Sequence, residues 1–192
     1  MTTVKLKVLT LNCWFVLGVF VPLACKDRLE RMKEIGRELS VGNYDIVFLQ
    51  EVWLKSDYQL LCQYILPAMP YTHYYYSGII GSGLCLFSKF KIIETSQFRS
   101  LFSLNGYAHR LMCGDWMADK SVGFAKILLE PGSIKLNAYT THLHAQYSED
   151  NTYHAYEEHR CLQSFELAKF LRDTSCSCDC VVVGGDFNIT PN

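Results

Sequence analysis

The chain has 192 residues, of which 49% are hydrophobic and 14% aromatic, so it carries enough apolar side chain for one folded domain and is not a disordered segment. Its 18 Lys and Arg residues are balanced by 19 Asp and Glu residues. Because the net charge is only −1, no general cationic field attracts a polyanion, and nucleic acid is not the expected partner. Nine cysteines lack the spacing of a disulfide framework and follow no secretory signal, which favours a reducing compartment.

The first third of the chain alternates predicted strands and helices. An apolar run over residues 15–25 is about half the length of a bilayer span and contains Gly18 and Pro22, so it is not a transmembrane helix. We expect this run to pack against the core, with contact to a lipid surface as the alternative. Hydrophobic periodicity predicts an inner strand over 5–12, a helix over 27–39, a buried strand over 44–52 and a helix over 56–66 with Ser56 as N-cap.

Strands follow one another through the middle of the chain. The glycine-rich GIIGSG segment lacks the order GxxxxGK[ST] of a phosphate-binding loop, so we interpret it as a turn between two strands. The predicted elements are paired strands over 71–76 and 83–88, a hairpin over 122–130 and 133–142, a helix over 152–172 and a last strand that begins at 181. The apolar face of that helix is predicted from three-residue steps at Leu162, Phe165, Ala168 and Leu171. This mixed order predicts an α/β sandwich of packed sheets under outer helices.

Polar side chains stand where the predicted strands end. Asn12, Glu51, His142 and the pair Asp186 and Asn188 all occupy such positions, where α/β sheets collect ligand-binding groups. Carboxylate and amide oxygens suit a divalent cation, and an imidazole and amide donors suit a phosphate oxygen. No Ser or Cys stands in a nucleophile elbow, which disfavours acyl transfer. The set therefore predicts metal-assisted phosphodiester hydrolysis, provided that the five side chains meet.

Five motifs carry a family resemblance across nearly the whole chain. They are LNCW at 11–14, QEVW at 50–53, GSGLCLFSK at 81–89, NAYTTHLHA at 137–145 and VVVGGDFN at 181–188. Together they resemble the neutral sphingomyelinases, magnesium-dependent members of the DNase I-like endonuclease/exonuclease/phosphatase superfamily. The resemblance implies a DNase I-like two-sheet β-sandwich flanked by helices, Mg²⁺ as cofactor, and hydrolysis of sphingomyelin or a related choline phospholipid to ceramide and phosphocholine at a membrane surface.

The resemblance also assigns roles. Glu51 is the expected magnesium ligand with Asn12 beside it. His142, Asp186 and Asn188 are the expected catalytic residues, and His142 and Asn188 are also expected to bind the substrate phosphate. Lys120, after Asp119, resembles a family loop residue that contacts substrate. The family's general base is an Asp-His pair on a later strand that this chain does not include. We therefore expect residues 1–192 to be a partial domain, C-terminal strands missing, of an intracellular, cytosol-facing, membrane-associated enzyme.

Several alternatives remain open on the sequence alone. The same metal core would serve a nuclease or an inositol-phosphate phosphatase, and a chain without its base could be an inactive phospholipid-binding module. Alternating cysteines at 176, 178 and 180 could bind Zn²⁺, although their spacing is unusual. Asn188-Ile189-Thr190 fits the N-glycosylation pattern, which we interpret as a chance match. His144 is expected to pack beside His142, and His154 and His159 to be surface or packing residues.

Overall fold

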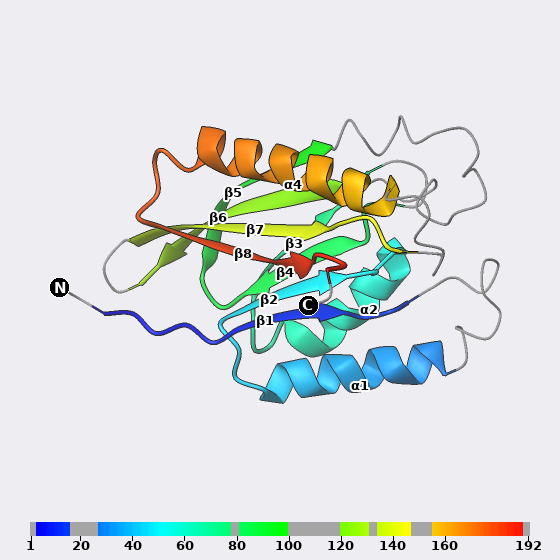
Figure 1. The fold of residues 1–192 in the computed structure, drawn as a ribbon. Coiled ribbons are helices and arrows are strands. Elements are labelled where there is room, and N and C mark those ends of the chain that lie inside the picture. The colour runs from blue at the N-terminus through cyan, green and yellow to red at the C-terminus, as the bar shows by residue number, and fades with distance from the viewer. Residues whose placement is uncertain are drawn as a thin grey trace.

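The computed structural model describes residues 3–15, 27–77, 81–99, 120–130, 134–146 and 155–189. Eight strands in this part form two four-stranded sheets that pack face to face (Figure 1). Sheet A has the order β1 (Val8–Asn12), β2 (Ile46–Gln50), β4 (Leu84–Ser88), β3 (Tyr71–Tyr75). Sheet B has the order β5 (Lys91–Arg99), β6 (Ser121–Leu129), β7 (Ile134–His142), β8 (Cys180–Asp186).

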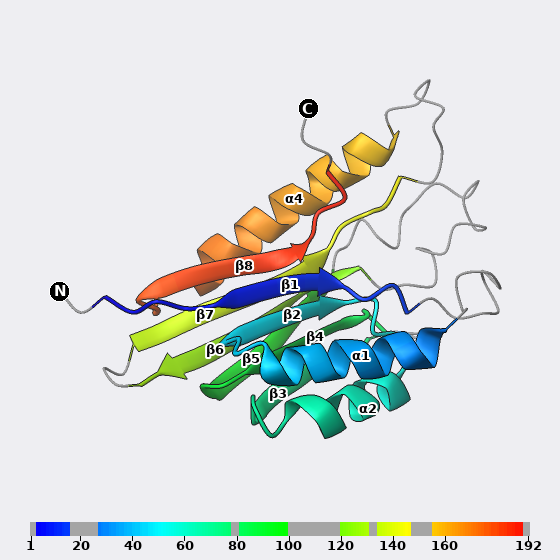
Figure 2. The same ribbon diagram turned by 90° about the horizontal axis from the view of Figure 1, so that it is seen from below.

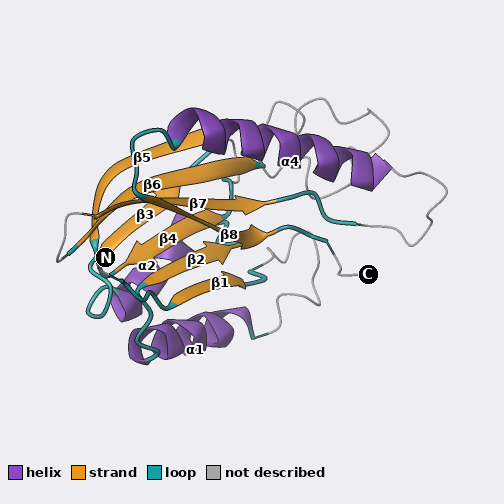
Figure 3. Cartoon of the chain, turned by 60° about the vertical axis from the view of Figure 1, so that its left-hand side comes forward, coloured by secondary structure: helices purple, strands orange, loops and turns teal. Residues whose placement is uncertain are grey.

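Helices cover both outer faces of the sandwich (Figure 3). Helices α1 (Arg28–Val41) and α2 (Lys55–Ile65) lie along sheet A (Figure 2), and α4 (Ala155–Thr174) lies along sheet B. The prediction of a two-sheet sandwich flanked by helices is therefore confirmed. No helix in the described ranges is long and apolar enough to cross a membrane.

Three apolar layers hold these elements together. The first joins α1 and α2 to one face of sheet A, the second joins the other face of sheet A to sheet B, and the third joins sheet B to α4. Strands β2 and β4 are buried along all five of their residues, because both of their faces meet one of these layers. The middle layer includes Phe48, and the sheets approach so closely there that a Cβ on Gly184 would lie 2.3 Å from the Phe48 ring.

Parallel pairing brings four strand ends to one end of the molecule. Strand β1 pairs in parallel with β2, and β7 pairs in parallel with β8. The arrowheads of β1, β2 and β8 point the same way in Figure 1. The carboxyl ends of strands from both sheets therefore meet at one edge of the sandwich, which is the arrangement that the sequence pattern required.

In the N-terminal half the structure corrects two predicted elements and adds one strand. Strand β1 is the edge strand of sheet A as described, not an inner strand. Helix α2 has its N-cap at Leu54, two residues before the predicted Ser56 and with no side-chain cap, so Ser56 lies inside the helix. Strand β5 was not predicted, because its register shifts between Ile92 and Glu94 and this irregularity interrupts the alternation that marks a strand. In the apolar run, Phe15 is fully buried, as expected; residues 16–26 lie outside the described ranges.

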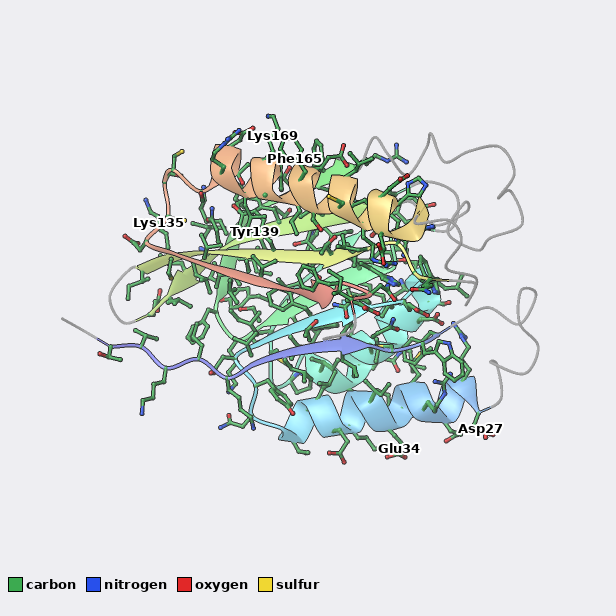
Figure 4. All side chains as sticks on the ribbon, viewed as in Figure 1. Asp27, Glu34, Lys135, Tyr139, Phe165 and Lys169 are labelled. Atoms are coloured by element: carbon green, nitrogen blue, oxygen red, sulfur yellow. The ribbon has the colours of Figure 1, made fainter. Side chains whose placement is uncertain are left out.

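The predicted apolar face of α4 is wrong at three of its four residues, because Leu162, Phe165 and Ala168 are exposed. Phe165 is 69% exposed and Leu162 is 40% exposed, and Figure 4 shows Phe165 on the outer side of the helix. The side chains that pack against sheet B are Leu167, Phe170 and Leu171. Only the last of these belongs to the predicted face, so the stripe of the helix that meets the sheet differs from the predicted one.

Candidate active site

Four polar residues stand at the strand ends that meet at this edge. Asn12 is the last residue of β1, Glu51 follows β2, His142 is the last residue of β7, and Asp186 is the last residue of β8. In the parallel register of sheet B, His142 lies directly opposite Asp186. The structure thus brings together side chains that are up to 174 positions apart in the sequence.

Asn12 links the two carboxylates. Its Nδ2 donates one hydrogen bond to Glu51 Oε1 at 2.9 Å and another to Asp186 Oδ2 at 2.8 Å. Its Oδ1 accepts a hydrogen bond from the backbone N–H of Trp14 at 2.9 Å, which fixes the orientation of the amide. Glu51 and Asp186 belong to different sheets, so Asn12 joins the sheets at the site.

The backbone at Glu51 is unusual. Its φ is +61°, in the left-handed region that non-glycine residues seldom adopt. Such a residue costs on the order of 1 kcal/mol and persists where the surrounding structure holds it, typically at functional sites. The hydrogen bond from Asn12 is one contact that holds Glu51 in this position.

Asp186 is held as a carboxylate. Its Oδ1 accepts the Asn188 backbone N–H at 3.0 Å, and His142 Nε2 lies 3.8 Å from its Oδ2. Burial by itself raises the pKa of Asp186, but the hydrogen bonds from Asn12 and Asn188 lower it. The Lys120 ammonium, and His142 when it is protonated, act in the same direction, and the pKa of Asp186 therefore lies below its usual value. Asp186 is ionised at neutral pH.

The carbonyl of Leu143 is a second point of convergence. It accepts hydrogen bonds from Asn188 Nδ2 at 2.9 Å and from Lys120 Nζ at 3.2 Å. The Lys120 side chain is buried beneath the strand ends, and its contact with substrate stays a prediction. Asp119 lies outside the described ranges. A backbone carbonyl leaves no signal in a sequence, so sequence reasoning could not have found this contact.

Helix α4 forms the opposite wall. The backbone N–H of His144 donates to Gln163 Oε1 at 2.9 Å, and the His144 ring lies against His159 with 5.2 Å between ring centres. His159 is therefore a packing residue, as expected, and His154 lies outside the described ranges. Sequence reasoning missed Gln163, whose only signal is a polar residue within a helix that packs on a sheet.

A pocket of about 820 Å³ lies between the strand ends and α4. The strand ends contribute one wall, with Asn12, Asp186 and Asn188 among its residues. Helix α4 contributes the other wall, through Glu157, Arg160, Cys161 and Ser164. The site is therefore a polar, open cleft that carries ionised Asp186 and amide donors on one side.

The endonuclease/exonuclease/phosphatase family model matches residues 9–192, and therefore nearly the whole chain. The chain belongs to the endonuclease/exonuclease/phosphatase family. Within this family it is 43% identical over 189 residues to mouse sphingomyelin phosphodiesterase 2, and 42% identical over 187 residues to a putative neutral sphingomyelinase of Caenorhabditis elegans. It is also 37% identical over 187 residues to an inositol phosphosphingolipids phospholipase C of Schizosaccharomyces pombe.

Each of these matches covers 97–98% of this chain but only 42% of the relative. The chain therefore spans less than half the length of the relatives that it matches. Among solved structures, the fold resembles a beta toxin mutant of Staphylococcus aureus with bound magnesium ions, at a TM-score of 0.76 and 19% identity. That likeness covers 98% of this chain and 67% of the toxin chain.

The donor set of this family member fits magnesium. In the described part of the chain, no group of three or more His, Cys, Asp or Glu residues could hold a metal ion. A tetrahedral zinc site needs about four such ligands, so the described residues, Cys176, Cys178 and Cys180 included, offer none. Mg²⁺ keeps several of its waters and takes about one or two carboxylates. Glu51, with Asn12 and Asp186 beside it, suits that requirement.

Proposed function

We propose that this chain forms the metal- and phosphate-binding part of a magnesium-dependent phosphodiesterase of the phospholipase C type. Its proposed substrate is sphingomyelin or a related choline phospholipid, cleaved to ceramide and phosphocholine. The single observation that supports this most strongly is the Asn12 bridge between Glu51 and Asp186, because it places a carboxylate ligand beside a second, ionised carboxylate. Two relatives that are 42–43% identical are named as sphingomyelin-cleaving enzymes, which supports the substrate class.

Each residue has a role in this chemistry. Glu51 would hold Mg²⁺, and Asn12 would complete or orient that site; the ion, when bound, polarises a phosphoryl oxygen and stabilises the charge that develops in the transition state. His142 and Asn188 would donate hydrogen bonds to the phosphate. Asp186, kept ionised, would orient His142 and the attacking water.

The rim of the site supports action at a lipid surface. Trp14 is 55% exposed and follows Asn12 by two residues, and Ile189 is 63% exposed and follows Asn188 directly. A tryptophan combines an apolar ring with a polar N–H and suits the interface between lipid and water. We propose that the protein meets its substrate at a cytosol-facing membrane surface, with these side chains in contact with lipid.

Glu51→Gln in the intact protein tests the metal role. With sphingomyelin in mixed micelles and Mg²⁺ titrated, we expect a loss of activity of about 10²-fold or more, because the charge of the ligand is removed at equal size. The matched control is Glu94→Gln, a carboxylate on β5 that pairs with Lys126 and should leave the Mg²⁺ response unchanged. An unchanged Mg²⁺ response in the Glu51 variant would contradict the assignment.

A second substrate class is favoured by one comparison. The relative from Schizosaccharomyces pombe, 37% identical, is named for inositol phosphosphingolipids. Hydrolysis of sphingomyelin and of inositol phosphosphingolipid vesicles, measured side by side, separates the two head groups. Supercoiled DNA serves as a third substrate, on which we expect no cleavage because the net charge of the chain is −1.

A further inference from the structure

Helix α4 turns polar side chains toward the sheet and apolar side chains toward solvent over its first turns. Arg160 and Glu166 are each 9% exposed and Gln163 is 5% exposed, whereas Phe165 is 69% exposed. An ordinary surface helix has the opposite arrangement. Gln163 uses its buried position to hold the His144 backbone at the end of β7. Of these buried polar residues, Arg160 lines the cleft, and Gln163 and Glu166 pack behind it against Lys120 and His142.

Arg160 is the exceptional member of this face. Its Nη1 is buried and has no hydrogen-bond partner in the described part of the chain. A buried guanidinium that lacks a counter-charge is costly, because its hydration is lost without replacement. Native proteins leave few such groups, and those that remain call for an explanation such as a missing ion.

The position of Arg160 supplies that explanation. It lines the same pocket as Asn12, Asp186 and Asn188, across from the strand ends. Two carboxylates line this pocket in the described residues, Glu157 and Asp186. Asp186 accepts hydrogen bonds from Asn12 and from the Asn188 backbone on the opposite wall. Arg160 thus brings a buried nitrogen without a hydrogen-bond partner to the wall of the cleft, and a planar guanidinium matches the oxygens of a phosphate in a two-point contact.

We propose that Arg160 binds an anionic oxygen of the substrate's phosphodiester, from the α4 side of the cleft. This inference rests on the proposed function, since it takes the phosphodiester lipid as the occupant of the pocket. Arg160 is then a substrate-binding residue that neutralises the head group opposite the strand ends. Before the head group enters, Arg160 Nη1 has no hydrogen-bond partner among the described residues.

The test compares Arg160→Met and Arg160→Lys with the unaltered intact protein. Methionine keeps most of the unbranched apolar stem and removes the charge, and lysine restores the charge without the planar fork. Arg172→Met, at an exposed position near the end of the same helix, is the matched control. Binding of phosphocholine and of inorganic phosphate, each with Mg²⁺, is measured by calorimetry, and kcat and KM for sphingomyelin are measured separately.

We expect Arg160→Met to weaken phosphocholine and phosphate binding by about 10- to 100-fold, the value of a hydrogen bond to a charged group. KM should rise by a similar factor, and Arg160→Lys should recover part of the affinity. The melting temperature of the unliganded methionine variant should be unchanged or higher, because an unpaired buried charge is removed.

Two results would overturn the proposal. If Arg160→Met fails to fold or melts well below the unaltered protein, the guanidinium has a structural partner within the protein. If the variant folds and binds phosphate as tightly as the unaltered protein, Arg160 does not contact the head group. Calorimetry measures binding without turnover. If the protein does not cleave sphingomyelin but Arg160→Met still weakens phosphate binding, the Arg160 site is supported and only the proposed substrate is refuted.

Discussion

Replacement of Asn12 by alanine is the sharpest perturbation that the structure offers. The Asn12 amide donates to Glu51 at 2.9 Å and to Asp186 at 2.8 Å, and both acceptors are carboxylates. Alanine removes both hydrogen bonds and leaves two negative groups close together without the donor between them. We expect lower stability and weaker metal binding, for separate physical reasons.

The expected loss of stability follows from the two bonds. A hydrogen bond to a charged group is worth about 1.5–3 kcal/mol, and all three side chains are half-buried, which favours the lower value. Two bonds together give a loss of about 3 kcal/mol. For a protein of this size each kcal/mol lowers the melting temperature by about 2–4 °C, so a fall of about 6–12 °C is expected without Mg²⁺.

Metal affinity is expected to fall because, without the hydrogen bond from Asn12, the Glu51 side chain can leave the orientation in which it would bind Mg²⁺. Groups that orient a metal ligand typically contribute about 10- to 100-fold in affinity or activity. We therefore expect the Mg²⁺ concentration for half-maximal activity to rise by about that factor in Asn12→Ala.

Thermal denaturation with EDTA and with Mg²⁺, together with a Mg²⁺ titration of activity, measures both effects. Gln97→Ala is the control: it removes one neutral hydrogen bond to Ser121, on β5 and β6, and should lower stability by about 1 kcal/mol with no change in the Mg²⁺ titration. If Asn12→Ala shifts the Mg²⁺ titration no more than this control does, Asn12 does not position the metal ligand and the reasoning fails.

Three further predictions concern the protein around the site. Gly184→Ala places a methyl group 2.3 Å from the Phe48 ring and should cost about 1–3 kcal/mol in urea denaturation, and no loss would show that the sheets can separate freely. Burial raises the pKa of the Cys85 thiol, so iodoacetamide at pH 8 should modify exposed Cys176 and spare Cys85 by mass spectrometry. Burial also raises the pKa of Asp57, and the Arg28 guanidinium lowers it by less. The folded state therefore binds a proton at Asp57 more tightly than the unfolded chain does. The stability of the unaltered protein relative to Asp57→Asn should therefore fall as pH rises from 3.8 through the raised pKa, and a rise in that window would contradict the assignment.

The elements with regular periodicity were predictable from the sequence, and those that break it were not. Strands β2 and β4 form short apolar runs because both faces are buried, and such runs are visible in a sequence. Strand β5 contains an irregularity after Ile92 and has mostly exposed side chains, so neither alternation nor an apolar run marks it. In α4 the sequence shows apolar residues at helical spacing, but periodicity does not say which stripe meets the sheet. The spacing predicts that the stripe through Phe165 is buried, and in the structure that stripe is exposed.

The convergence of Asn12, Glu51, His142 and Asp186 was predictable for a topological reason. Parallel pairing aligns strand ends, so polar residues that follow buried strands collect at one edge of a sheet. The sequence could not predict the hydrogen bond from Asn12 to Asp186 that joins the two sheets, because this bond depends on how closely the sheets pack. The same limit hid the Leu143 carbonyl, which receives two side chains from different elements.

Because the site crosses from one sheet to the other, the packing between the sheets is part of the site. Gly184 lies two residues before Asp186 and lets β8 approach Phe48 on β2, the strand that ends beside Glu51. A larger residue at 184 would push β8 away from sheet A and lengthen the 2.8 Å contact between Asn12 and Asp186. Gly184 and Asn12 therefore both fix the spacing of the site. Gly184 sets the distance between the sheets, and Asn12 joins the carboxylates of Glu51 and Asp186 across that distance.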